Sequence, residues 1–157
     1  MKIKRAKYKE APGKKKIIAE AKRIISGWGL KMPEKVELAF DFGLKDFYRI
    51  GEVEFWIANE IAEGYCGKFL FLFSSQTCPK HYHIKKHETF YVVKGVVFMQ
   101  AGVKKFKMLK GDCFTMKPGV KHTFTSVKGP ALILEVSKPC EPGDSIFQDK
   151  KIMAALK

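Results

Sequence analysis

The feature that most constrains the fold is an alternation of apolar and polar side chains between residues 36 and 136. This period of two is typical of β-strands that bury one face. Turn signals such as Lys94-Gly95, Pro118-Gly119 and Gly129-Pro130 interrupt it, and no helical pattern lies between the segments. We therefore predict a mainly β protein with one antiparallel barrel or sandwich. The expected strands are 36–40, 53–57, 68–73, 89–93, 96–101, 113–116, 122–127 and 131–136.

Helical signals flank this region on both sides. A short amphipathic helix is expected after the Pro12-Gly13 breaker, since Ile17, Ala21, Ile24 and Trp28 share one helical face. A second short helix is expected around 152–156. The length of 157 residues suits one domain. We assign residues 1–16 to a Lys-rich arm and residues 17–157 to a single domain that includes the N-terminal helix.

The formal net charge of +14 raises the question of nucleic acid. Half of that excess lies in the arm, where eight basic residues face only Glu10. Lysine dominates, with three arginines in the chain, whereas base recognition favours arginine. We therefore do not expect nucleic acid as the partner. Abundant lysine with few Asn and Gln indicates a thermophilic source.

Apolar runs are short, and no cysteine motif is present. The longest run, 69–73, is far below the ~20 residues of a membrane helix, and no signal-peptide core follows the basic N-terminus. We expect a cytoplasmic protein without a membrane partner. Without a C-x-x-C motif, the four cysteines are expected to be free thiols. They are Cys66, Cys78, Cys113 and Cys140.

Three of the four histidines form a pattern that predicts a metal site. His81 and His83 are two residues apart, so on a strand their side chains share one face. Glu88 follows closely, and His122 comes after the Pro118-Gly119 turn. Three imidazoles and a carboxylate suit Mn, Fe, Co, Ni or Zn and leave open positions on an octahedral ion. The alternative is a set of polar residues in a barrel without metal. His87 should face away from this cluster.

These residues carry a family resemblance. The spacing His81-x-His83-x4-Glu88-x6-Gly95 resembles the first motif of the cupins, and residues 111–122 resemble the second. The resemblance implies a small cupin-type antiparallel β-barrel (jelly roll), with His81, His83, Glu88 and His122 as metal ligands. Three positions differ from the family pattern: Ser75 and Ser126 replace a glycine and an asparagine, and Pro118 is shifted by one.

Within the cupins, the chain resembles the D-lyxose isomerase family over most of residues 35–150. The similar stretches are 41–47, 50–53, 65–68, 75–90, Glu135-Val-Ser137 and Gly143-Asp-Ser-Ile-Phe147, although this tail lacks the arginine expected there. The resemblance implies a sugar isomerase (an intramolecular oxidoreductase) that converts an aldose such as D-lyxose or D-mannose into a ketose. It also implies a divalent ion, manganese before Fe, Co, Ni or Zn, and a homodimer.

The resemblance also suggests two catalytic residues, Glu135 as the base and Lys86 as a contact to a substrate oxygen. Apolar neighbours of Glu135 favour a raised pKa. The alternatives are that Glu135 faces outward and that Lys86 is a solvated lysine beside Lys85. Because cupins host many chemistries, a non-catalytic sugar- or ligand-binding cupin and an Fe(II)-dependent oxygen-using cupin stay open.

Overall fold

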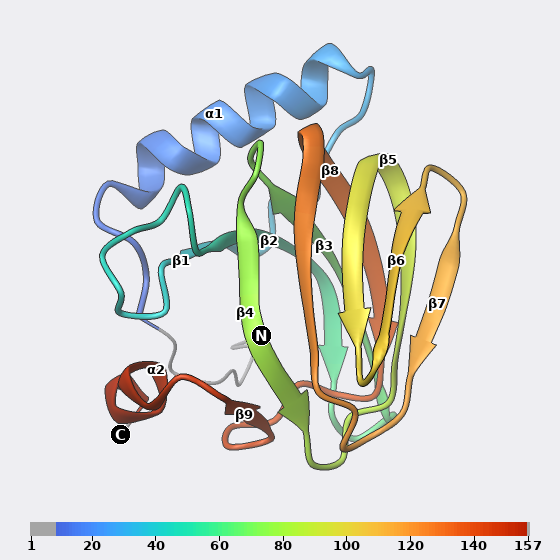
Figure 1. The fold of residues 1–157 in the computed structure, drawn as a ribbon. Coiled ribbons are helices and arrows are strands. Elements are labelled where there is room, and N and C mark those ends of the chain that lie inside the picture. Colours follow the sequence, from blue (N-terminus) through green and yellow to red (C-terminus); the bar gives the residue numbers. More distant parts are fainter. Residues whose placement is uncertain (1–8, 157) are drawn as a thin grey trace.

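The computed structural model describes residues 9–156 and confirms a mainly β chain with an N-terminal helix. The strands curve together, and the N-terminal helix lies outside them (Figure 1). Strand β4 was foreseen only through the spacing of its histidines, and β6 and β9 were not foreseen. In chain order the elements are α1 (Lys14–Gly27), β1 (Glu37–Phe40), β2 (Glu52–Glu60), β3 (Tyr65–Leu72), β4 (Thr77–His83), β5 (Glu88–Ala101), β6 (Lys104–Leu109), β7 (Cys113–Met116), β8 (His122–Ser137), β9 (Ser145–Phe147) and α2 (Lys150–Ala155).

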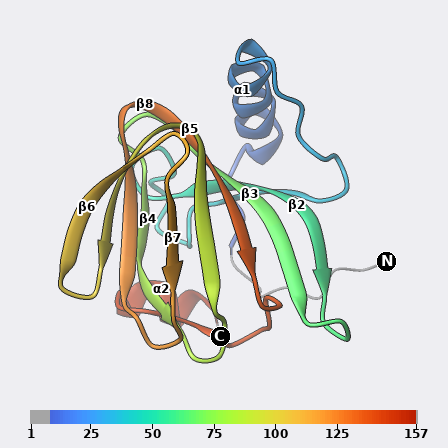
Figure 2. The same ribbon diagram turned by 90° about the vertical axis from the view of Figure 1, so that its right-hand side faces the viewer.

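All strands pair antiparallel in one curled sheet of order β1-β2-β3-β8-β4-β9, with β5 joined to β8 and also pairing β6 and β7. Figure 2 shows these strands side by side, with α1 above them. Strand β8 links the sheet, because its first part pairs with β4 and its second part with β3. The two sequence motifs therefore meet where β4 and β8 are neighbours.

Two turns expected from the sequence are irregularities inside long strands instead. Lys94-Gly95 lies within β5 and Gly129-Pro130 within β8, so four expected short strands are two long ones. Gly95 has a φ of +86°, and a Cβ there would lie 2.5 Å from the Pro130 carbonyl oxygen. The pairing of β5 with β8 shifts register at this point. Glycine therefore bends the strand and admits close approach of the neighbouring chain without ending the strand.

The turn before β4 contains Ser75, which replaces the glycine of the family pattern. Ser75 has a φ of +63°, the left-handed region that glycine favours. Ser126 donates its hydroxyl hydrogen to the Phe73 carbonyl, and the Gln76 side chain accepts from the Phe73 amide at 3.0 Å. Ser75 thus lies in the turn that leads into the strand of His81, and Ser126 on the neighbouring β8 hydrogen-bonds to the residue that begins this turn.

Two hydrophobic clusters explain which side chains face inward. One fills the barrel, and the other lies between α1 and the opposite face of β1–β3. Val53 and Phe55 belong to the cluster under α1, so the alternate residues Glu52, Glu54 and Trp56 face the barrel interior. The interior therefore contains charged side chains at one end.

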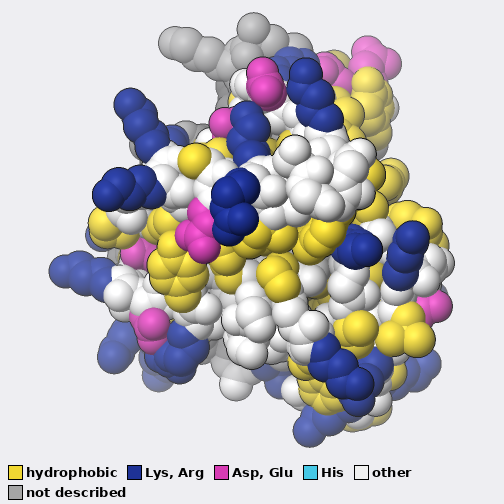
Figure 3. Space-filling model, turned by 90° about the horizontal axis from the view of Figure 1, so that it is seen from above, with side chains coloured by type: hydrophobic (Ala, Val, Ile, Leu, Met, Phe, Trp, Pro, Cys, Tyr) yellow, Lys and Arg dark blue, Asp and Glu magenta, His cyan; other side chains and the backbone are white. Residues whose placement is uncertain are grey.

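The N-terminal boundary differs slightly from expectation. Helix α1 begins at Lys14, so residues 14–16 of the expected arm are helical, while residues 1–8 lie outside the described part of the chain. On the face in Figure 3, basic side chains are spread out with apolar and acidic side chains among them. Within residues 9–156 no helix has the length and apolarity needed to cross a membrane.

Candidate metal centre and active-site cavity

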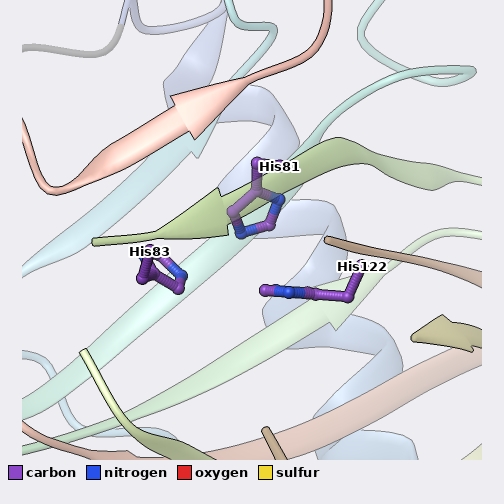
Figure 4. Close-up of side chains that lie close together, drawn as sticks. All are labelled: His81, His83 and His122. Atoms are coloured by element: carbon purple, nitrogen blue, oxygen red, sulfur yellow. The ribbon is translucent and has the colours of Figure 1, made fainter. Parts of the chain in front are cut away.

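Three histidine rings converge inside the barrel (Figure 4). His81 and His83 lie on β4, and His122 begins β8 directly opposite His81 in the strand register. All three side chains are buried, and one ring nitrogen from each lies within 4.8 Å of the others. The spacing of two along β4 and the antiparallel pairing with β8 together create the cluster.

The carboxylate of Glu88, at the start of β5, reaches the same point. Its Oε1 atom lies 3.0 Å from His122 Nε2 and 3.4 Å from His83 Nε2. The side chain is 2% exposed. The structure thus brings together the four residues that the sequence predicted as metal ligands.

The other ring nitrogens are held by hydrogen bonds. His81 Nδ1 lies 2.8 Å from the Pro79 carbonyl oxygen, and His122 Nδ1 lies 2.9 Å from that of Val120. Since a carbonyl only accepts, both Nδ1 atoms carry the proton, and in the neutral form of each ring the lone pair is on Nε2. His83 Nδ1 lies 3.2 Å from the Ser145 hydroxyl.

This donor set fits a divalent cation. His83 Nε2, His122 Nε2 and Glu88 Oε1 are buried without a hydrogen-bond partner, which costs free energy unless another group satisfies them. Burial and neighbouring histidines lower the pKa of His81, and burial with Lys86 lowers that of His83. Neutral imidazoles and a carboxylate are ligands of first-row divalent metals.

Lys86 and Glu135 lie together beside this cluster. Lys86 Nζ donates to Glu88 Oε2 at 2.8 Å and to Glu135 Oε1 at 2.8 Å. Their exposed fractions are 4% and 2%. The alternatives of a solvated Lys86 and an outward-facing Glu135 are therefore wrong, because the strand parity of β8 turns Glu135 into the barrel.

The pKa of Glu135 differs from the expectation of a raised value. Burial alone would raise it, but Lys68 and Lys86 outweigh burial and lower the pKa. The pKa of Glu88 is lowered as well, because the neighbouring Lys86 ammonium opposes the effect of burial. The sequence analysis considered only the apolar neighbours along the strand, whereas the cationic neighbours come from other strands. Glu135 is thus ionised at neutral pH.

A second buried pair was missed by the sequence analysis. Lys68 on β3 donates to Glu54 on β2 and lies 3.5 Å from Glu135 Oε2, and Trp56 Nε1 donates to Glu54 at 2.7 Å. Burial lowers the pKa of Lys68, but Glu135 and Glu54 outweigh burial and raise it well above its usual value. The sequence did contain a signal for an inward-facing Lys68. It lies two residues from both Cys66 and Leu70, so on a strand the three side chains share one face, and Cys66 and Leu70 face inward.

The loop after β8 secures the site. Asp144 accepts from the Lys85 amide at 2.7 Å and from the Lys86 amide at 3.2 Å, which fixes the turn between β4 and β5. The ring of Phe147 stacks on His81 with a centroid distance of 5.0 Å. The tail segment 143–147 therefore positions the histidines and Lys86.

Most of these side chains line one pocket, which includes His81, His83, Lys86, Glu88 and Glu135 but not His122. Among the described residues that line it, the basic residues besides histidine are Lys68 and Lys86, and both are paired with carboxylates. His87 lies elsewhere, in a shallow surface hollow with Thr89 and Lys138, as expected from its strand parity. The acidic residues that line the pocket are Glu52, Glu54, Glu88, Glu135, Glu141 and Asp144.

Comparison with known proteins places the chain in a family. Residues 72–137 match the family described as "Cupin domain". The chain is 32% identical to D-lyxose ketol-isomerase of Cohnella laeviribosi over 146 residues, which covers 76% of this chain and 79% of that protein. D-lyxose/D-mannose isomerase of Thermosediminibacter oceani is 28% identical with the same coverage.

Solved structures agree at the level of the fold. L-ribose isomerase of Cellulomonas parahominis without ligand has a TM-score of 0.78 at 14% identity and covers 99% of this chain and 98% of that one. L-ribose isomerase of Acinetobacter sp. DL28 in complex with L-ribose has a TM-score of 0.75 at 16% identity, with 96% and 97% covered. Together with the 32% identity above, these findings mean that the chain belongs to the D-lyxose ketol-isomerase family, whose fold is the cupin barrel.

Proposed function

We propose that this protein is a metal-dependent aldose–ketose isomerase that acts on a small unphosphorylated sugar such as D-lyxose or D-mannose. The observation that carries the proposal is the direct contact of Lys86 with both Glu88 of the donor cluster and Glu135. The contact supports the proposal, because a buried carboxylate and a buried cation lie next to the candidate metal ligands. The family assignment supports the same activity.

His81, His83, Glu88 and His122 would hold the ion, with manganese the first expectation. When bound, a divalent ion polarises a sugar carbonyl and stabilises negative charge on its oxygen. We assign proton transfer between the carbons to Glu135, which takes the proton from carbon 2 of the aldose and returns it to carbon 1, while the hydroxyl proton passes from the oxygen on carbon 2 to the oxygen on carbon 1. Its lowered pKa keeps it in the basic form at neutral pH.

Lys86 has the second role. Its ammonium lies between Glu88 and Glu135, 2.8 Å from each, so a substrate oxygen held there would receive a charge-assisted hydrogen bond. The pKa of Lys86 is raised because Cys140, Glu135 and Glu88 outweigh the opposing effect of burial. Lys86 therefore stays cationic and stabilises negative charge on the substrate without giving up its proton.

The charges of the pocket favour a neutral sugar. Its two lysines are already bound to carboxylates, and the described arginines, Arg23 and Arg49, are absent from its lining. A phosphate would have to displace a buried carboxylate to gain a cationic partner, which is costly. Hydroxyl groups can instead hydrogen-bond to these carboxylates as they stand.

The test is ketose formation from free and phosphorylated aldoses by protein stripped with chelator and reloaded with Mn²⁺, Fe²⁺, Co²⁺, Ni²⁺ or Zn²⁺. We expect ketose only after reloading and only from free sugars. His83→Ala should lose bound metal and turnover together, whereas the control His87→Ala keeps both. Turnover without metal, or none despite stoichiometric metal, would contradict the proposal. In the second case, sugar binding without product indicates a binding cupin, and oxygen consumption indicates an oxygen-using one.

We also expect a homodimer formed through the outer face of the sheet. Exposed apolar side chains on that face are Ile57, Tyr65, Tyr91 and Val136. Val136 pairs in register with Gly67 and Thr89, so these positions form one continuous surface across three strands. Sedimentation of wild type and Val136→Lys would test it, since a lysine there should favour monomers. A cytoplasmic location and a thermophilic source stay predictions.

A further inference from the structure

Two of the four cysteines lie against each other beside the pocket, and one of them, Cys140, lines it. Cys66 Sγ on β3 and Cys140 Sγ in the loop after β8 are 3.8 Å apart. They are 74 residues apart in sequence, and both are free thiols. A disulfide would require the two sulfur atoms to move from this contact to a bond of about 2.05 Å.

The contact is built by hydrogen bonds to the backbone of Cys140. Asn59 Nδ2 donates to the Cys140 carbonyl at 3.0 Å, and the Cys140 amide donates to Asn59 Oδ1 at 2.9 Å. Asn59 is the register partner of Cys66 on the adjacent strand. One side chain on β2 therefore holds Cys140 over Cys66.

The two thiols are not equivalent. Cys140 is half-buried, lines the pocket and lies 3.8 Å from Lys86 Nζ, while Cys66 is 1% exposed behind it. A hydrogen bond from Cys66, together with Lys86 and Lys68, lowers the pKa of Cys140. Cys66 is held as the thiol, because its hydrogen bond to Cys140 and its burial raise its pKa. Cys140 is thus the accessible nucleophile and Cys66 the thiol that can resolve it.

We propose that Cys66 and Cys140 form a reversible disulfide when the protein meets hydrogen peroxide, and that this disulfide slows the isomerase. The effect on turnover rests on the proposed function. Disulfide formation itself rests only on the geometry of the two thiols.

The chemistry balances with peroxide as the two-electron oxidant. The Cys140 thiolate attacks one peroxide oxygen, the O–O bond breaks, and the leaving hydroxide takes a proton, which yields a sulfenic acid and water. The Cys66 sulfur then attacks the sulfenic sulfur. The S–S bond forms as the S–O bond breaks, and the departing hydroxide leaves as water with the Cys66 proton. In sum, two thiols and one peroxide give one disulfide and two waters.

The disulfide would act on Lys86. Moving Cys140 Sγ toward β3 withdraws it from Lys86 Nζ. It also pulls on the loop whose Asp144 accepts from the Lys86 amide. Because Lys86 is the proposed contact to the substrate oxygen, its displacement should lower turnover roughly tenfold while the histidine cluster keeps its metal.

The test uses reduced, Mn²⁺-loaded protein treated with hydrogen peroxide, which is removed with catalase before assay. Free thiols are alkylated, and peptides are mapped without reduction by mass spectrometry. We expect a cross-linked peptide pair containing Cys66 and Cys140, a roughly tenfold fall in turnover at unchanged metal content, and recovery with dithiothreitol. The oxidised protein should also melt higher by roughly 10 °C, because the cross-link closes a long loop.

Two variants serve as controls. Cys66→Ser should leave Cys140 as a sulfenic acid that dimedone traps, with no cross-link and no rise in melting temperature. Cys113→Ser removes an exposed cysteine of β7 that lies outside the pocket lining, and it should behave as wild type throughout. Absence of the Cys66–Cys140 cross-link overturns the proposal, and so does a cross-linked protein with full turnover. If the reduced protein converts no sugar, the proposed function fails, while the cross-link and the melting shift still decide whether the thiol pair is redox-active.

Discussion

Replacing Glu135 with glutamine should separate catalysis from metal binding. The substitution keeps the shape of the side chain and removes its charge. Glu135 is absent from the donor cluster, which consists of three histidines and Glu88, so the variant should bind as much metal as wild type. If Glu135 transfers the proton, kcat should fall by about 10²–10⁴, equivalent to about 3–5 kcal/mol of activation free energy.

The structure also sets the cost in stability. Glu135 lies 2.8 Å from Lys86 Nζ and 3.5 Å from Lys68 Nζ, and both lysines are buried. Each lysine keeps another carboxylate, Glu88 or Glu54 respectively. The loss should therefore stay below the ~3–5 kcal/mol that an unpartnered buried charge costs. We expect about 2–3 kcal/mol, and a melting temperature lower by roughly 5–10 °C.

The assay measures kcat with the best sugar at saturating Mn²⁺, at a temperature well below the transition of the variant. Metal content and circular dichroism are recorded on the same samples. The matched control is Glu63→Gln, an exposed carboxylate between β2 and β3, which should leave kcat, metal content and melting unchanged. Turnover within threefold of wild type in a folded, metal-loaded Glu135→Gln protein would refute the assignment of Glu135 as the base.

Three further predictions concern the buried charges and the metal. Burial and Glu54 raise the pKa of Glu52 to about 8, so the folded state holds a proton that the unfolded state releases, and stability falls as pH rises from about 4.5 to 8. Glu52→Gln should not show this fall. In urea denaturation it should be more stable than wild type by about 3 kcal/mol at pH 7 and equally stable near pH 4. The same pH dependence of stability in both proteins would contradict the raised pKa of Glu52. Lys68→Met leaves Glu54 buried without its cation and should lower the free energy of unfolding by about 3–5 kcal/mol. Adding Glu54→Gln should recover a part of this loss, whereas additive losses in the double variant would argue against an interaction between the two residues. Mn²⁺ at a hundredfold excess over its dissociation constant should stabilise wild type and His87→Ala by about 2.7 kcal/mol, measured by calorimetry, but should not stabilise His122→Ala. An equal stabilisation of all three proteins would mean that the ion binds at another site.

The local pattern of the sequence was enough for the fold class and for the candidate metal ligands. Alternation along a strand depends only on residue spacing, so most of the β-strands followed directly from it, although β6 and β9 did not. The pair His81 and His83 shares a face for the same reason. Turns within strands were less predictable, because Gly95 is required by the neighbouring Pro130 carbonyl, a contact that no local pattern contains.

Contacts between distant strands decided the rest of the site. Whether the pKa of Glu135 rises or falls depends on Lys68 from β3 and Lys86 from the turn before β5. The contact of Cys66 with Cys140 likewise joins residues 74 apart. Electrostatic interactions and thiol reactivity depend on distance in space, and only the curled sheet brings these groups within a few ångströms. The sequence by itself therefore determined which residues share a face, and the tertiary structure decided which charges and thiols meet.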